Sequence, residues 1–78
     1  MEENRIVLNQ KIMVGKPIIR GTRIPVDLIV RLVAQGATVT EILENYPNLT
    51  KEDIRAALRY AAKLAEGEIF FPLKEENA

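Results

Sequence analysis

The stretch G-K-P-I-I-R-G-T-R-I-P-V, residues 15–26, decides the fold of this 78-residue chain. It combines two glycines and two prolines with alternating apolar residues and three cations, a composition that excludes a helix. Gly15 allows a tight bend, residues 17–20 favour an extended piece, and residues 21–22 turn the chain again. The residue before Pro25 must be extended, whereas Pro25 itself suits the first turn of a helix. We therefore predict a strand, a turn and a helix entry.

The segment before this stretch is β-prone. Residues 5–8 favour a strand, residues 9–11 favour a turn, and residues 12–14 are apolar again. A two-stranded hairpin alone is marginally stable in water. We therefore expect these strands to pair across a dimer or to pack on the helices.

The segment after this stretch predicts two short helices. Apolar residues at helical spacing place the first at about residues 25–35, with Gly36 as its terminator. The second begins at Thr38 or Thr40 and stops at Pro47. The two predicted apolar stripes are Val26, Ile29, Val30 and Val33, widened by Leu28 and Leu32, and then Val39, Ile42, Leu43 and Tyr46.

The third predicted helix has the clearest start signal in the chain. Thr50 is the expected N-cap, with Asp53 at the third helical position and Leu49 able to pack on Ile54 across the cap. The helix should run to about residue 66 and end at Gly67. Its expected buried face is Ile54, Ala57, Leu58, Ala61 and either Leu64 or Ala65.

Length and composition limit the class of protein. A single small domain of this length buries too little surface to be very stable alone, and no cysteine can supply a disulfide, so we expect a homodimer. The acidic N-terminus lacks the basic start of a signal peptide, and no apolar run reaches membrane-spanning length. We expect a cytoplasmic protein that does not bind membranes.

The residue types that are absent argue against catalysis. The chain has no Ser, Cys, His or Trp, which removes the common nucleophiles, the most common general base and the soft metal ligands. We therefore expect no enzymatic activity, no catalytic residues, no metal and no cofactor.

The net charge is zero, yet residues 5–31 carry six cations and one anion, whereas residues 32–78 carry five cations and eight anions. This asymmetry favours a polyanion-binding face.

The second helix, the connection 47–50 and the third helix form a candidate helix-turn-helix. On the third helix, cations recur every four residues, which is mildly repulsive unless an anionic partner is bound. The alternative is a solvated face whose last cations complement the helix dipole. Glu52 and Asp53 count against DNA, because anions in the first turn would meet phosphates. The candidate DNA contacts on this helix are Thr50, Lys51, Arg55 and Arg59.

Lys16, Arg20 and Arg23 lie in the glycine-rich extended segment. They could contact phosphates as an arm beside the helix-turn-helix. The slightly favoured alternative is structural, with Arg20 or Arg23 pairing to Asp27 or capping carbonyls.

Residues 68–78 form a separate C-terminal tail after a domain at residues 1–67. This apolar tail either folds back on its own core, which is slightly favoured, or docks on a partner through Ile69, Phe70, Phe71 and Leu73.

The residues at 15–26, together with G-A-T-V-T-E-I-L-E-N-Y-P-N-L-T-K-E-D-I-R-A-A-L-R-Y-A-A at 36–62, resemble the domain-of-unknown-function 433 family. The resemblance covers about residues 6–65. It implies a mainly α fold: a three-helix, homeodomain-like helix-turn-helix bundle with a short N-terminal β element, which tends to dimerise.

The resemblance also implies a function. Members are regarded as VapB-like antitoxins of type II toxin-antitoxin pairs, encoded beside a PIN-like ribonuclease toxin. The expected function is therefore an antitoxin and transcriptional regulator that binds double-stranded operator DNA and neutralises its toxin partner. The alternative is a protein-binding adaptor that binds no DNA.

Overall fold

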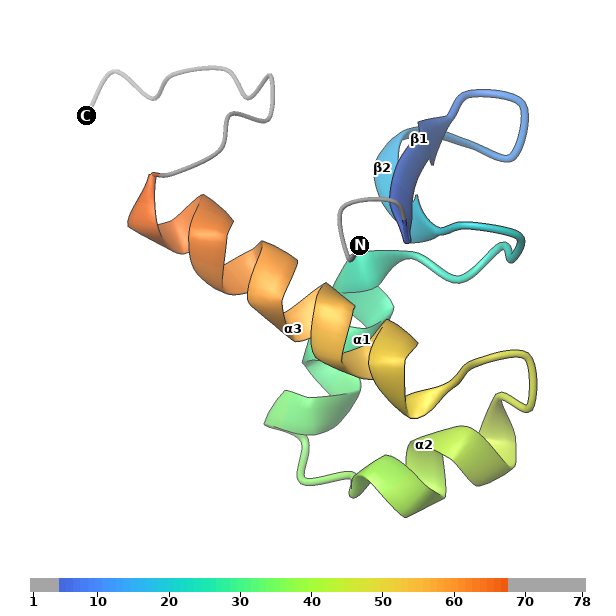
Figure 1. The fold of residues 1–78 in the computed structure, drawn as a ribbon, viewed down its shortest axis with the longest axis vertical. Helices are drawn as coiled ribbons and strands as arrows, with labels where there is room; N and C mark the ends of the chain where they lie inside the picture. Colours follow the sequence, from blue (N-terminus) through green and yellow to red (C-terminus); the bar gives the residue numbers. More distant parts are fainter. Residues whose placement is uncertain (1–4, 68–78) are drawn as a thin grey trace.

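The computed structural model describes residues 5–67, and at Met13 it describes the backbone only. Two strands precede three helices in this range (Figure 1), so the predicted mainly α fold with an N-terminal β element is confirmed. Helix α3 crosses α1, while the hairpin and α2 lie at opposite ends of α1. The elements are β1 (Ile6–Asn9), β2 (Met13–Ile19), α1 (Val26–Ala34), α2 (Val39–Asn45) and α3 (Lys51–Glu66).

The two strands pair with each other in an antiparallel hairpin within one chain. Ile6 lies opposite Ile19 and Leu8 opposite Pro17, but Asn9 pairs with Met13, which leaves residues 14–16 as extra residues on β2. The predicted bend at Gly15 is therefore wrong, because a single strand continues through it as a bulge. Gly15 has a φ of 80°, a left-handed conformation that is strained for residues with a Cβ.

The entry to α1 is built by a short turn. The Thr22 hydroxyl donates to the carbonyl oxygen of Ile19 at 2.8 Å and accepts from the N–H of Ile24 at 3.0 Å. The N–H of Ile19 in turn donates to the carbonyl oxygen of Ile24 at 2.9 Å. Pro25 follows as the extended N-cap residue of α1. The turn and helix entry predicted from residues 21–26 are thus confirmed.

Both later helices begin with a complete capping box. At α2 the Thr38 hydroxyl accepts from the N–H of Glu41 at 3.1 Å, and the Glu41 carboxylate accepts from the N–H of Thr38 at 2.8 Å. At α3, Thr50 and Asp53 make the same reciprocal pair. The capping box of Thr38 and Glu41 shows that α2 starts with Thr38, and not Thr40, as its N-cap. Gly67 ends α3 with a φ of 80°, as predicted for its left-handed terminator.

The core lies where β2 and the three helices meet. Two predicted stripe residues are not part of it, since Val33 is 37% exposed and Val39 is 40% exposed. On α1, Leu32 packs against the core instead of Val33, and α2 contacts the core through its later turns. The buried cluster is Ile19, Val26, Ile29, Ile42, Leu49, Ile54 and Ala57. Of the two alternatives on α3, Leu64 is half-buried and Ala65 is exposed.

Candidate functional site

The exposed face of α3 carries the predicted row of cations. Ile54 and Ala57 are buried on the opposite side of the helix, and the four-residue spacing keeps the cations away from them. Nη1 of Arg55 lies 3.6 Å from Oε2 of Glu52. Both side chains are largely exposed, so this pair contributes little to stability. The exposed cations are Lys51, Arg55, Arg59 and Lys63.

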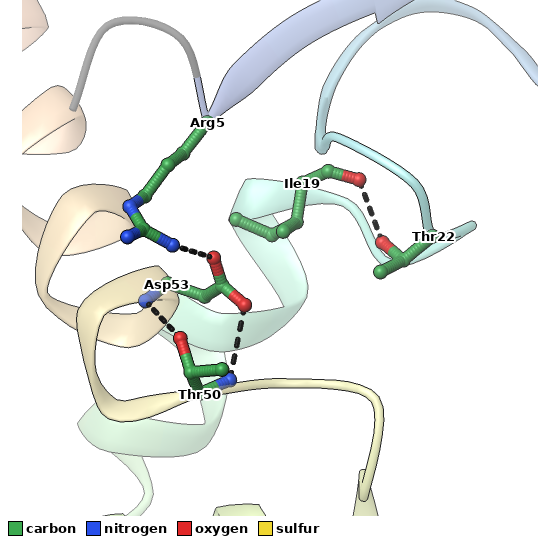
Figure 2. A network of polar contacts seen from close by, with 5 residues as sticks. All are labelled: Arg5, Ile19, Thr22, Thr50 and Asp53. Carbon is green, nitrogen blue, oxygen red and sulfur yellow. Dashed lines mark hydrogen bonds and ion pairs between the residues drawn. The ribbon is translucent and has the colours of Figure 1, made fainter. Parts of the chain in front are cut away.

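Asp53 is turned away from this face. Its residue is 7% exposed, and its Oδ1 accepts from Nη1 of Arg5 at 3.0 Å. Oδ2 accepts from the N–H of Thr50 at 3.0 Å, while the Thr50 hydroxyl accepts from the N–H of Asp53 at 3.1 Å. Figure 2 shows Arg5 reaching this carboxylate from the start of the hairpin. The expectation that both first-turn anions oppose DNA is therefore wrong for Asp53.

The ion pair that the N-terminal cations make with α1 differs from the predicted one. Lys16, rather than Arg20 or Arg23, pairs with Asp27, with Nζ 3.0 Å from Oδ2. The pair joins β2 to the first turn of α1. Arg20 and Arg23 are exposed and make no ion pair with any residue between 5 and 67. Their predicted structural role is therefore not observed there, and Lys16 fills it.

Two surface hollows are lined by different members of the N-terminal set of cations. Arg23 lines an open hollow of about 640 Å³ beside the end of α2, together with Tyr46, Pro47 and Asn48. Lys16 lines a second hollow, and neither lining includes a cation of α3. Arg23 therefore lies near the connection between α2 and α3.

The second hollow is an apolar groove that the sequence did not reveal. It has a volume of about 520 Å³ and lies between β2, α1 and the second half of α3. Burial raises the pKa of the Tyr60 hydroxyl on its wall. No row of residues in the sequence marks this groove, because its walls come from three separate elements. We call it the β2–α1–α3 groove; its lining is Gly15, Pro17, Val26, Val30, Tyr60, Ala61 and Leu64, with Lys16, Asp27 and Arg31 at its polar margin.

The lining of the groove is mostly apolar. Apart from the Tyr60 hydroxyl, its polar side chains are confined to Lys16, Asp27 and Arg31, and two of these three are paired with each other. Within residues 5–67 no three carboxylates gather to hold a metal ion. The expected partner contacts Ile69, Phe70, Phe71 and Leu73 lie outside the described residues.

A family model described as "Protein of unknown function (DUF433)" matches residues 6–61, most of the chain. The chain belongs to the DUF433 family. A crystal structure of a DUF433 member protein from Anabaena variabilis aligns with a TM-score of 0.74 at 42% identity, covering 83% of this chain and 64% of that one. The likeness to this DUF433 member extends the match from sequence to the three-helix architecture.

Two protein sequences are also similar to this chain. The uncharacterized protein y4eO of Sinorhizobium fredii is 46% identical over 50 residues, which are 64% of this chain and 23% of that protein. An uncharacterized protein of Archaeoglobus fulgidus is 64% identical over 28 residues, which are 36% of this chain and 78% of that protein. The chain thus spans less than a quarter of the length of the Sinorhizobium relative.

The helices between residues 5 and 67 include none that combines the length and apolarity needed to cross a bilayer. The longest, α3, has 16 residues and several charges on its outer face. An apolar helix would need about 20 residues to span the hydrocarbon core.

Proposed function

We propose that this DUF433 member is a non-catalytic, DNA-binding transcriptional regulator that also serves as an antitoxin. The elements α2 and α3 are joined by a five-residue connection, residues 46–50, and both helices contact α1. In this proposal α3 lies in the major groove of operator DNA, with Thr50 and Lys51 at its leading end.

The position of Asp53 carries the proposal. Its carboxylate is occupied by Arg5 and by the N–H of Thr50 and is turned inward. The outer face of α3 therefore keeps its cations without this anion, which improves the electrostatic match to phosphates. Glu52 still lies on the exposed side, but Arg55 can leave that weak pair for a phosphate oxygen.

Salt dependence tests the DNA contacts. Each phosphate contact adds about 0.9 to the slope of log affinity against log salt concentration. We expect Lys51→Ala and Arg55→Ala each to weaken DNA binding and to reduce the slope by about that amount. Lys11→Ala is the matched control, because Lys11 is an exposed cation in the turn of the hairpin. No binding at low salt, or equal losses in all three variants, would contradict the proposal.

The antitoxin half rests on the family resemblance and on the apolar tail sequence. We propose that Ile69, Phe70, Phe71 and Leu73 contact a PIN-like ribonuclease toxin. Ribonuclease activity should fall when the protein is added, and the Phe70→Ala/Phe71→Ala variant should restore it. Lys74→Ala should inhibit as well as the unchanged protein. Equal inhibition by all three would show that the tail is not the contact.

A protein-binding adaptor is the second candidate. The zero net charge of the chain favours it, because many nucleic-acid-binding domains are strongly basic. In that case the outer face of α3 meets an acidic protein surface. Lys51→Ala and Arg55→Ala would then weaken binding to that protein, while DNA binding would be absent at every salt concentration.

A further inference from the structure

We propose that residues 69–73 of this same chain occupy the β2–α1–α3 groove in the free protein. The proposal goes beyond the regulatory function, since it concerns the isolated protein without DNA or toxin. It identifies the docking site of the segment I-F-F-P-L and gives the tail a resting position from which a partner must displace it.

The groove offers what an apolar segment requires. Its walls include Val30, Tyr60 and Leu64, all only half-buried within the described chain. The groove is thus an apolar surface left uncovered by residues 5–67, next to the end of the longest helix. Burying two phenylalanine side chains lowers the free energy by more than the loss of their rotamer freedom raises it.

Chain continuity selects the tail as the occupant. Helix α3 ends at Glu66, and Gly67 donates its N–H to the carbonyl oxygen of Leu64 in a left-handed cap that breaks the helical path. Leu64 and Ala61, on the last turns before this cap, already line the groove. Five extended residues span about 17 Å, whereas Tyr60 and Leu64 are separated along the helix by about 6 Å. The segment is therefore long enough to run back along the wall.

Charge and local concentration point the same way. The groove margin carries Lys16 and Arg31 against the single anion Asp27, while the residues that flank the apolar segment, Glu68, Lys74, Glu75 and Glu76, carry a net charge of −2. A segment joined to the groove by one residue after Gly67 has an effective concentration in the millimolar range. A second copy at micromolar concentration competes poorly with it.

Cysteine pairs in the otherwise cysteine-free full chain test the position. Ala61→Cys, on the groove wall, is combined with Phe70→Cys or, separately, with Phe71→Cys, so that each pair leaves one phenylalanine in place. The matched controls put Ala62→Cys in the same combinations, because Ala62 is exposed on the next helical position. We expect an intramolecular disulfide in at least one Ala61 pair, formed about tenfold faster than in its Ala62 control.

The other outcomes overturn the proposal. Equal rates for the Ala61 and Ala62 pairs would show a tail without a preferred site. A covalent dimer as the main product of the Ala61 pairs would show that the tail of a second copy fills the groove. Since neither measurement uses DNA or toxin, failure here leaves the proposed regulatory function standing, and failure of DNA binding leaves this proposal standing.

Thermal unfolding provides a second test that needs no cross-link. Phe70→Ala/Phe71→Ala should lower Tm by about 4–8 °C, the shift expected for loss of a modest apolar contact in a chain of this size. Lys74→Ala, just beyond the segment, should leave Tm unchanged. Equal Tm values for the double variant and the unchanged protein would contradict docking.

Discussion

At the residue scale, Asp53 joins two parts of the molecule. One oxygen holds Arg5 of the hairpin, and the other closes the capping box of α3. The Asp53 side chain is 10% exposed and that of Arg5 is 40% exposed, so the pair is less screened than the surface pair between Lys16 and Asp27. This carboxylate thus fixes both the start of a helix and the docking of the hairpin.

Replacing Asp53 should therefore cost more than replacing its neighbour. We expect Asp53→Ala to lower the free energy of unfolding by about 2 kcal/mol, because it removes one half of the capping box and the charge-assisted hydrogen bond to Arg5. Glu52→Ala, at an exposed position in the same turn, should change it by less than about 0.5 kcal/mol. Urea unfolding followed by circular dichroism measures both, and similar values would contradict the role assigned to Asp53.

Tyr60 should make stability fall at alkaline pH. Burial raises the pKa of its hydroxyl above the ordinary value of 10.0, so the folded protein holds this proton more tightly than the unfolded chain. The resulting stability is fully present below pH 10 and is lost as pH rises through the folded pKa. In Tyr60→Phe, the decline in Tm above pH 10 should be shallower; an unchanged decline would show that other groups cause it.

At the element scale, the helix ends were predictable because their signals are local. Thr50 and Gly67 act on groups within four residues of themselves, so spacing in the sequence is sufficient. The bulge at Gly15 was not predictable, since it depends on which residues of β1 lie opposite it. The inward turn of Asp53 also escaped prediction, because its partner is 48 positions away, and the groove escaped because three elements form it.

The capping box of α2 predicts different stability changes for alanine substitutions at two nearby threonines. Thr38→Ala should destabilise the protein by about 1 kcal/mol, because it leaves the N–H of Glu41 without its cap. Thr40→Ala, within the helix, should be neutral or slightly stabilising, since alanine has the higher helix propensity. Chemical denaturation of both variants makes the comparison, and a larger loss at Thr40 would place the start of α2 there.

At the scale of the whole molecule, Ile29 lies in the hydrophobic core that residues 5–67 form. It is 0% exposed and lies in the cluster that joins β2 to the three helices. Ile29→Ala should cost about 2–5 kcal/mol, enough to unfold much of a small domain. Leu8→Ala, at a residue that is 55% exposed, should cost less than about 1 kcal/mol.

The measurement for this pair is unfolding followed by two probes. Far-ultraviolet circular dichroism reports the helices, and tyrosine fluorescence reports Tyr46 and Tyr60, since the chain has no tryptophan. Coincident transitions in both variants would show that the helices and the tertiary contacts of the two tyrosines are lost together. Separate transitions in Ile29→Ala would instead show that the core is divided.

The 48-residue separation between Arg5 and Asp53 also determines how late during translation the hairpin can gain its contacts with α3. Translation adds about 5–20 residues per second, so Arg5 is made roughly 2–10 s before the aspartate that will hold it. During that interval the hairpin has neither its ion pair nor α3 to pack on, and an isolated pair of strands is only marginally stable. Until α3 has emerged, the nascent hairpin therefore has only α1 to pack on, and we expect the domain to complete its fold after that point.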